Sequence, residues 1–486
     1  MSDSPKAARQ RFFCAIRPAR DCRACTSRHL PGNGLFKFIK FLFDFEEKMS
    51  ETETAIIDID SADITRLAWN YEEEVSFVRQ DGEWQYEADE KMAVDQELLD
   101  EIAENLSQIT SDKMVEEVQA LSVYGLSEPS YSITVETEEE TYEIQIGDET
   151  FSDGEIYISI GDDYVYLTDA ELTDEIAYSL LDCVQKEEIP EMESISALTI
   201  NNEETVDMVY KENSGYCYSD AYTYYLKENE AYRNLDNEKT ESAFADLSEF
   251  SWEECADYYA EDSELASYGL EEPAAEVSIV YTPVQEEGEE EEEAETSEDS
   301  AEQTEEEQEF SYQVGTANDT YYAKLTDSNI VYTISQEVYD AAVNASYEEL
   351  KPDEVILLDW STVDSIEIEF DGNVYAVEVE NGGEEDAVYT FNDSEIEFSD
   401  ILEQLSQITI SEDQEAELSD NKEELALTFH RNTEENSTVE LVFYQYNGSY
   451  CISVLNGEET NCVDRESVVD LKEAVNSVIL DTNYEE

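Results

Sequence analysis

The stretch SVYGLSEPSYSITVE at residues 122–136 returns in altered form as ASYGLEEPAAEVSIV at residues 266–280. In both copies a YGL turn leads into a run in which apolar residues recur at every second position. Such alternation predicts a strand with one buried face. The chain therefore contains the same turn-to-strand unit twice, which suggests an internal repeat.

The residue types of this turn have a physical reason. Gly125 and Gly269 can adopt a positive φ, or allow a close backbone approach, where a side chain would clash. Pro129 and Pro273 fix φ and lack an N–H, which suits the entrance of a strand. We expect these four residues to form a structural turn.

Three helices are predicted at equivalent places of the repeat. The pentapeptide LSQIT occurs at residues 106–110 and again at 405–409, each time at the end of an apolar stripe of helical period. The stripes predict helices over 95–109, 239–251 and 399–409.

Strands with period-two alternation and D-G or N-G hairpin signals surround these helices. Closing helices are expected near 169–185, 335–349 and 465–479. This pattern favours an α+β fold of three tandem related modules, with mostly antiparallel sheets and two helices in each. The predicted divisions are a basic, disordered N-terminal segment (1–50), module 1 (51–190), module 2 (191–355) with an acidic disordered loop (285–309), and a divergent module 3 (356–486).

The charge of the chain limits its partners. It has 125 acidic and 25 basic residues and a formal net charge of −100. Its first 48 residues hold 10 of the basic residues and only 5 acidic ones, so the remainder has a net charge of −105. Such a surface disfavours nucleic acid as a partner. Divalent cations are expected to screen it weakly at many sites, without a specific site.

No motif in the sequence identifies a reaction. Walker, GxSxG, HExxH and GxGxxG patterns do not occur, and with so many carboxylates no acid–base pair can be chosen. We therefore predict no catalytic residues, no cofactor, no metal site and no enzymatic activity. Cys451 and Cys462 fall in neighbouring predicted strands, which leaves open one disulfide or two buried free thiols.

The run YCYSDAYTYYLKENEAY at 216–232 is unusually rich in tyrosine. Tyrosine offers a large contact area with a polar tip and is frequent at interfaces. The alternative is that these rings pack across neighbouring strands. The candidate partner surface consists of Tyr216, Tyr218, Tyr222, Tyr224 and Tyr225.

The ordered motifs DITRLAWN, DGEWQYEAD, LSQIT, VYGLSEP, YEIQIGDE and DDYVYLTD together resemble the bacterial domain of unknown function numbered 4340, DUF4340. The resemblance covers 58–190 clearly, 191–350 well and 351–486 loosely. Members of that family usually begin with one transmembrane helix, and their genes often lie beside components of ABC-type transporters. The resemblance implies an extracytoplasmic, membrane-anchored body in the cell envelope, although no anchor is readable in this chain.

Two functions remain open at this point. The first is a non-enzymatic envelope protein, an auxiliary or scaffold component of a membrane complex of the ABC-transporter type. The second is an extracytoplasmic saccharide-binding module or a hydrolase with a carboxylate pair in an inter-domain cleft. A deep pocket with converging titratable groups would favour the second, and shallow surfaces would favour the first.

Overall fold

The structure is a computed structural model that describes residues 49–71, 73–150, 154–212, 216–229, 231–284, 306–384, 386–411 and 418–482. The strands in these residues form three sheets. Their neighbouring strands are antiparallel, and helices alternate with groups of strands along the chain. The predicted α+β class with mostly antiparallel sheets is therefore confirmed.

Contacts within the chain define two compact units. Unit 1 contains the described residues up to Tyr71 and those of Ile102–Ala177, and unit 2 contains the described residues of Glu72–Glu101 and those from Tyr178 onward. The sequence suggested three modules. The second and third sheets fall into one unit because a single hydrophobic cluster combines buried residues of both.

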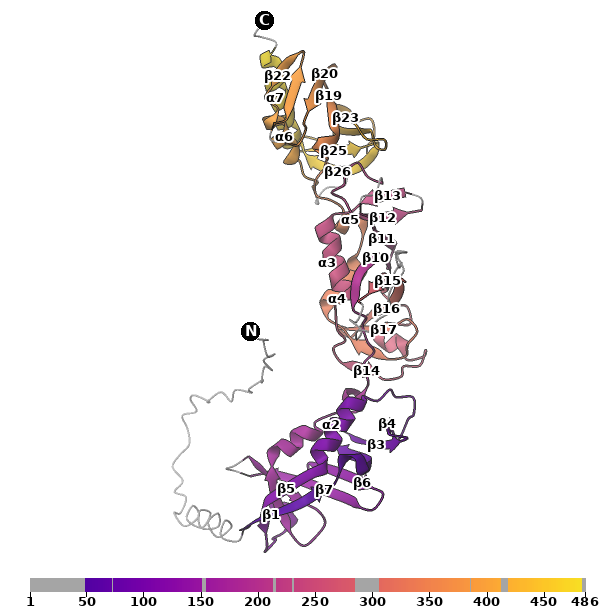
Figure 1. Ribbon diagram of the computed structural model, residues 1–486, viewed down its shortest axis with the longest axis vertical. Helices are drawn as coiled ribbons and strands as arrows, with labels where there is room; N and C mark the ends of the chain where they lie inside the picture. Colours follow the sequence, from indigo (N-terminus) through magenta and orange to yellow (C-terminus); the bar gives the residue numbers. More distant parts are fainter. Residues whose placement is uncertain are drawn as a thin grey trace, which may run out of the picture. The chain divides into compact units, whose positions relative to one another are not determined.

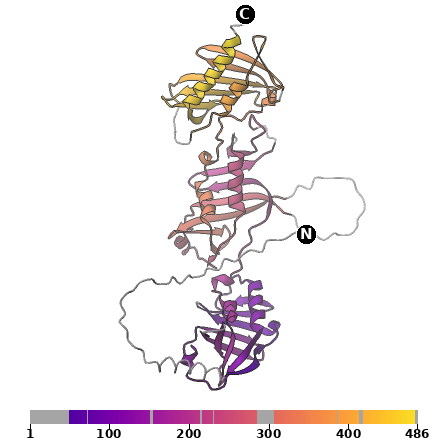
Figure 2. The same cartoon turned by 90° about the vertical axis from the view of Figure 1, so that its left-hand side faces the viewer.

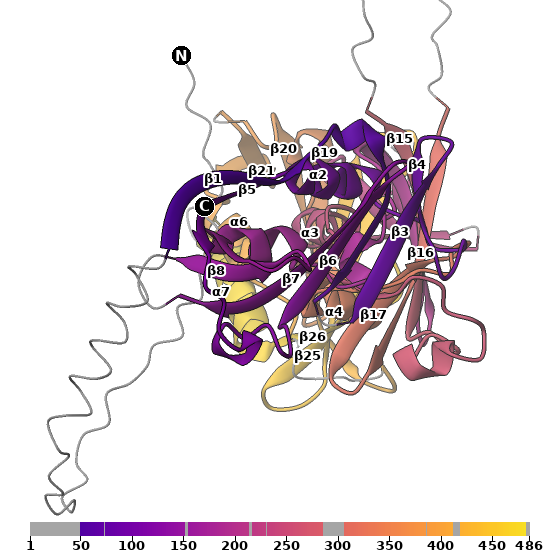
Figure 3. The same ribbon diagram turned by 90° about the horizontal axis from the view of Figure 1, so that it is seen from below.

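The first sheet has nine strands, whose bounds are β1 (Met49–Asp58), β2 (Ile64–Asn70), β3 (Glu74–Gln80), β4 (Glu83–Tyr86), β5 (Gln108–Val115), β6 (Tyr131–Thr137), β7 (Thr141–Glu149), β8 (Glu155–Ser159) and β9 (Val165–Asp169). Seven of them lie in unit 1 in the order β1-β5-β9-β8-β7-β6-β2, and β3 and β4, which pair with each other, lie in unit 2. Figure 3 shows β1 and β5 side by side, in agreement with their antiparallel pairing. Strand β1 begins at Met49, two residues before the predicted start of module 1.

Helix α2 (Gln96–Ser107) occupies the first predicted helical segment. The Asp95 carboxylate accepts a hydrogen bond from the N–H of Leu98 at 3.0 Å, which satisfies one free donor of the first turn. The predicted apolar stripe is buried, and it comprises Leu99, Ile102, Ala103 and Leu106. The helix ends at Ser107 because the next residue, Gln108, pairs with β1.

The helix predicted over 169–185 is wrong. The chain forms two 3-10 segments there, Ala170–Ile176 and Leu181–Cys183. Between them lies Ser179, whose N–H and hydroxyl donate hydrogen bonds to the carboxylate of Asp182 in the second segment, at 2.8 and 2.7 Å. Such local side-chain bonds compete with helical backbone bonding. The sequence therefore has the apolar spacing of a helix, but the chain does not form a continuous helix.

The second sheet lies in unit 2, and its strands are β10 (Met192–Asn201), β11 (Thr205–Tyr210), β12 (Tyr224–Glu228), β13 (Ala231–Asn234), β14 (Cys255–Asp257), β15 (Ala275–Pro283), β16 (Gln308–Ala317), β17 (Thr320–Leu325) and β18 (Val331–Thr333). Their order is β13-β12-β11-β10-β15-β16-β17-β18-β14. Helices α3 (Asn237–Ser248) and α4 (Gln336–Asn344) lie on one face of this sheet, as Figure 1 shows. Helix α3 contacts β10, and α4 contacts β15 and β16.

Two boundaries in this region differ from the prediction. The closing helix expected over 335–349 is divided, because the chain leaves α4 and starts the short α5 (Tyr347–Leu350), which Ser346 caps through the N–H of Glu349 at 3.3 Å. The acidic loop predicted over 285–309 is shorter at its end, since β16 begins at Gln308. Residues 285–305 lie outside the described part of the chain.

The third sheet also lies in unit 2, and its strands are β19 (Val363–Phe370), β20 (Asn373–Glu380), β21 (Val388–Phe391), β22 (Ser394–Ile396), β23 (Lys422–Arg431), β24 (Thr438–Gln445), β25 (Tyr450–Leu455) and β26 (Glu458–Asp464). Their order is β22-β21-β20-β19-β23-β24-β25-β26. Helix α6 (Ser399–Ser406) packs against α7 (Arg465–Thr482), and Figure 2 shows α7 lying across one face of the sheet. Both helices were predicted at these places.

None of the helices in the described ranges is long and apolar enough to cross a membrane. Residues 1–48, for which disorder was predicted, fall outside those ranges.

Candidate functional site

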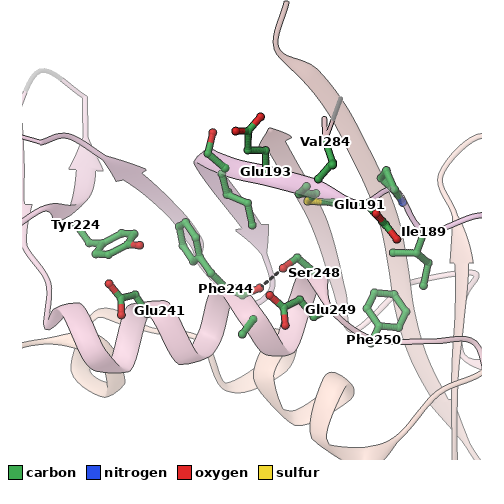
Figure 4. Close-up of a pocket in the computed structure, with 15 residues that line it drawn as sticks. Ile189, Glu191, Glu193, Tyr224, Glu241, Phe244, Ser248, Glu249, Phe250 and Val284 are labelled. Carbon is green, nitrogen blue, oxygen red and sulfur yellow. Dashed lines mark hydrogen bonds between the residues drawn. The ribbon is translucent and has the colours of Figure 1, made fainter. Parts of the chain in front are cut away.

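An open groove of about 600 Å³ lies between α3 and the beginning of β10 in unit 2. Figure 4 shows Glu241, Ser248 and Glu249 on α3 and Glu193 on the strand opposite. The groove is lined by Ile189, Pro190, Glu191, Met192, Glu193, Ser194, Ile195, Tyr224, Glu241, Phe244, Ala245, Ser248, Glu249, Phe250 and Val284. These residues come from four separate parts of the chain, which the fold brings together.

Helix α3 supplies one wall of the groove through a single face. Its lining residues are spaced by three or four positions, as residues on one side of a helix must be: Glu241, Phe244, Ala245 and Ser248. The N-terminus of the helix is capped by Asp236, whose carboxylate accepts a hydrogen bond from the N–H of Lys239 at 2.9 Å. The orientation of this wall therefore follows from the cap and the helical period.

Aromatic side chains form the apolar part of the groove. The rings of Tyr224 and Phe244 meet edge to face with centroids 5.3 Å apart. Phe250 packs on Trp252 and Tyr312 at 5.0 and 5.1 Å. Rings fixed in this way present a firm surface to a ligand without a large loss of side-chain entropy.

The charge of the groove is uniformly negative. Four of its lining residues are glutamates, Glu191, Glu193, Glu241 and Glu249, and no lining residue is basic. The pKa of the Tyr224 hydroxyl is raised, first by burial and then by the negative charge of Glu241. The groove therefore favours cationic ligands and disfavours anionic ones.

Glu249 stands at the end of a helix, where a negative charge is unfavourable. Glu249 is the C-cap residue of α3, where the carbonyl groups carry partial negative charge. A carboxylate at this end does not stabilise the helix. Its position is better explained by the groove that it borders than by the stability of α3.

The lining of the groove offers little for covalent chemistry. The Ser248 hydroxyl donates to the Phe244 carbonyl oxygen at 2.7 Å, the usual bond of a serine inside a helix. Among the lining residues there is no histidine, cysteine or lysine. In the described part of the chain no group of three or more His, Cys, Asp or Glu residues is arranged to hold a metal ion.

The structure places the glycines of the repeated turn at positive φ, 73° for Gly125 and 70° for Gly269. A Cβ on Gly125 would lie 2.6 Å from the backbone nitrogen of Asp148, and one on Gly269 would lie 2.3 Å from the carbonyl oxygen of Thr316. Both turns therefore press their backbone against a strand.

Each turn meets a second glycine on that strand. A Cβ on Gly147 would lie 2.1 Å from the Tyr124 carbonyl oxygen, and one on Gly315 would lie 2.4 Å from the Gly269 carbonyl oxygen. The motifs YEIQIG at 142–147 and FSYQVG at 310–315 correspond in the two copies, and each ends in one of these glycines. The glycine shared by the two motifs was the feature of the sequence from which this contact could have been predicted.

The prolines stand two residues before a strand in both copies, Pro129 before β6 and Pro273 before β15. The next residues make equivalent hydrogen bonds, Ser130 N–H to Ile146 and Ala274 N–H to Val314, each at 2.9 Å. None of the four turn residues lines the groove, and they act in the backbone of the sheets.

Three of the five tyrosines of the predicted partner surface lie in the interior. Tyr218 and Tyr222 are 4% exposed, Tyr225 is fully buried, and all three belong to the cluster that joins the second and third sheets. The Tyr225 hydroxyl donates to the Tyr222 carbonyl oxygen at 2.7 Å. The partner of these three rings is therefore the third sheet of the same chain.

The other two tyrosines have different surroundings. Tyr216 is 47% exposed and stacks on Tyr232 with centroids 4.0 Å apart. Tyr224 lines the acidic groove, so it is the one member of the set that the fold brings to the candidate site. Beside the tyrosine cluster, the Asn436 side chain donates to the Cys217 carbonyl oxygen at 3.0 Å.

Cys451 and Cys462 are both buried free thiols. Cys451 pairs with Val463, and Cys462 pairs with Ile452, so the two side chains point to opposite faces of the sheet. Burial raises the pKa of the Cys451 thiol to about 11. The register explains why no disulfide joins these neighbouring strands.

Residues 84–259 match the family model described as a domain of unknown function, DUF4340. The match confirms the suspected resemblance over this range, which begins in β4 and ends just after β14. It includes all of β10 and α3, and every lining residue of the groove except Val284. The searches of curated proteins and of solved structures returned no match.

Proposed function

We propose that this protein is a non-enzymatic, extracytoplasmic component of the cell envelope that acts as a scaffold or auxiliary subunit of a membrane complex of the ABC-transporter type. The observation that supports a docking role is the groove along α3, with its aromatic floor and four glutamates. The resemblance to DUF4340 supports the location, because members of that family are usually anchored in the membrane and encoded beside such transporters.

We further propose that the chain consists of three tandem related modules. Helices α2, α3 and α6 each follow the opening strands of one sheet. The first two sheets share the YGL turn and its paired glycines. The third sheet keeps the LSQIT sequence at the end of α6 but has no YGL turn, which fits its assignment as the divergent copy.

The alternative function was a saccharide-binding module or hydrolase with a carboxylate pair between domains. A crevice of about 200 Å³ does lie between the second and third sheets. Its lining includes one carboxylate, Glu458, together with Arg233. Glycoside hydrolysis requires two carboxyl groups flanking one bond, so the lining of this crevice favours the docking role.

The experiment is site-specific photo-crosslinking in intact bacterial cells. A photoreactive residue at Glu193 is expected to crosslink to a subunit of a membrane transporter, identified by mass spectrometry. The same residue at Glu369, an exposed position of β19 in the third sheet, is the control. Crosslinks to soluble proteins alone, or the same partners from both positions, would contradict the proposed function.

A further inference from the structure

Strand β10 extends beyond its neighbour β11. The pairing of these strands runs from Asn201↔Thr205 to Ala197↔Val209, and β11 ends at Tyr210. On its other side β10 is paired with β15 as far as Met192↔Pro283. In the described structure, Met192, Ser194 and Ile195 have a strand partner on the β15 side, while Glu193 and Ser196 fall at shifts in that register. Among the described strands, none of residues 192–196 has a partner on the β11 side.

This one-sided segment forms the edge of the groove. Met192, Glu193, Ser194 and Ile195 all line it, opposite α3. Tyr224, which lines it as well, begins β12 and pairs with Tyr210, the last residue of β11. The space therefore lies where a continuation of β11 would run, with backbone groups of β10 along one side.

The equivalent place in the third sheet is closed. There β20 pairs with β19 from Phe370↔Asn373 to Ser365↔Glu378, leaving only two residues of β19 beyond the ladder. Gly382 then approaches the strand entrance so closely that a Cβ on it would lie 2.2 Å from the Trp360 carbonyl oxygen. The longer open edge in the second sheet is thus not a general consequence of the fold.

We propose that residues 192–196 of β10 bind an extended peptide segment of a partner protein by strand addition, and that this segment alternates basic and apolar residues. The inference rests on the proposed docking function and names its ligand class. An added strand would continue the line of β11 and hydrogen-bond to the backbone of β10. Five residues of strand provide about 17 Å of edge.

The side chains around the edge select the alternating pattern. One face of an added strand would meet the rings of Phe244 and Tyr224, which suits apolar side chains. Figure 4 shows the Glu193 carboxylate pointing away from α3, so basic side chains on the other face would meet it. Glu241 and Glu249 lie at the border of the groove on the helix side and add to the attraction.

The same charges disfavour the acidic part of a second copy of this chain as the occupant. Past residue 48 the chain has 120 acidic and 15 basic residues. A strand from such a surface would place like charges opposite Glu193, which is destabilising. Charged residues on an edge strand commonly serve to prevent such self-association. A basic segment meets no such penalty.

The test measures binding of a fluorescent seven-residue peptide of alternating lysine and valine to the full chain by anisotropy. The second probe has glutamate in place of lysine. Two further lysine–valine peptides carry N-methyl groups, one peptide at the odd positions and the other at the even positions. Because the N–H groups of a strand point alternately to its two sides, only one of these peptides loses the donors that face β10. N-methylation leaves the peptide charge unchanged and therefore separates strand addition from simple charge attraction.

The matched variants are E193Q/E249Q in the groove and E369Q/E378Q on the third sheet, which make the same change in net charge. Glu369 and Glu378 are exposed strand residues, and Glu249 does not stabilise α3. We expect the lysine peptide to bind and the glutamate peptide not to bind. We expect one N-methylated peptide and the groove variant each to lose roughly tenfold in affinity, about 1.4 kcal/mol, with the control variant unchanged.

Three results would overturn the inference. Equal binding of both N-methylated peptides would show attraction without strand addition, and equal loss in both variants would show binding outside the groove. A dimer of the full chain that E193Q/E249Q strengthens would show that the edge pairs with a second copy. If the crosslinking experiment succeeds while the peptide test fails, the docking function stands and the strand-addition mode does not.

Discussion

The repeated turn depends on contacts between backbones that only glycine allows. At Gly125 two requirements coincide, since its φ is 73° and its Cα faces the backbone of Asp148. The Asp148 N–H donates to the Tyr124 carbonyl oxygen at 2.8 Å, which holds the turn on β7. A side chain at this position would strain the backbone and also separate the turn from the strand.

We expect Gly125→Val to lower the free energy of unfolding of unit 1 by about 1–3 kcal/mol, because it combines φ strain with a clash. The measurement is thermal or denaturant unfolding of the full chain, followed in unit 1 by hydrogen exchange. Gly161→Val is the control, since Gly161 has a φ of 82° and nothing within 4 Å of its Cβ position. Equal losses in the two variants would mean that the close approach contributes nothing.

For single residues, the sequence predicted the backbone conformation better than the packing of the side chain. A glycine and a proline restrict the backbone locally, so the turn could be read from Gly125 and Pro129 alone. A tyrosine carries no such restriction, and its packing depends on distant residues. The run at 216–232 therefore did not reveal that Tyr218 and Tyr225 face the third sheet.

At the scale of elements, a buried ion pair fixes α7 to the third sheet. Glu424 of β23 is 7% exposed, and its carboxylate accepts hydrogen bonds from Arg465 at 2.7 Å and from Lys472 at 3.4 Å. Burial alone would raise the pKa of Glu424, but Arg465 and Lys472 outweigh it and lower the pKa. The strand and the helix are thus linked through a charge that requires both partners.

Glu424→Gln should lower the free energy of unfolding by about 1–3 kcal/mol near pH 7, because a buried, charge-assisted contact is lost. Glu423→Gln, at the exposed neighbouring position, should change it little. Since the folded pKa of Glu424 is lowered, its contribution is present above the unfolded pKa of about 4.3 and is lost as the pH falls through the folded value. The gap between wild type and Glu424→Gln should therefore close below about pH 4. A gap that stays constant to pH 3 would contradict the assignment.

A helix was predictable where a capping residue and an apolar stripe agreed, as at Asp95 and α2. The stripe alone misled at 169–185, because Asp182 bonds to Ser179 and interrupts the backbone pattern. The groove could not be predicted, since it depends on β11 ending at Tyr210 while β10 continues to Met192. Relative strand lengths leave no local mark in the sequence.

At the scale of the whole molecule, the charge of −100 must be accommodated in every folded state. Like charges on a compact chain repel one another and destabilise it. The repulsion acts over the Debye length, which falls from about 30 Å at 10 mM salt to about 10 Å at 100 mM. Stability should therefore depend strongly on ionic strength, even though few of the charges are buried.

We expect the melting temperature to rise as sodium chloride is increased from about 10 to 100 mM, by roughly 2–4 °C for each 1 kcal/mol of repulsion relieved. Potassium chloride should have the same effect, because screening depends on ionic strength and not on the identity of the monovalent cation. Magnesium chloride at equal ionic strength should raise the melting temperature further, since divalent cations gather more strongly at a dense carboxylate surface. Titration calorimetry should then show weak heats without a defined stoichiometry. A saturable site with micromolar affinity would instead show that a few of these carboxylates form a specific metal site, and it would contradict the expected screening by many weak contacts.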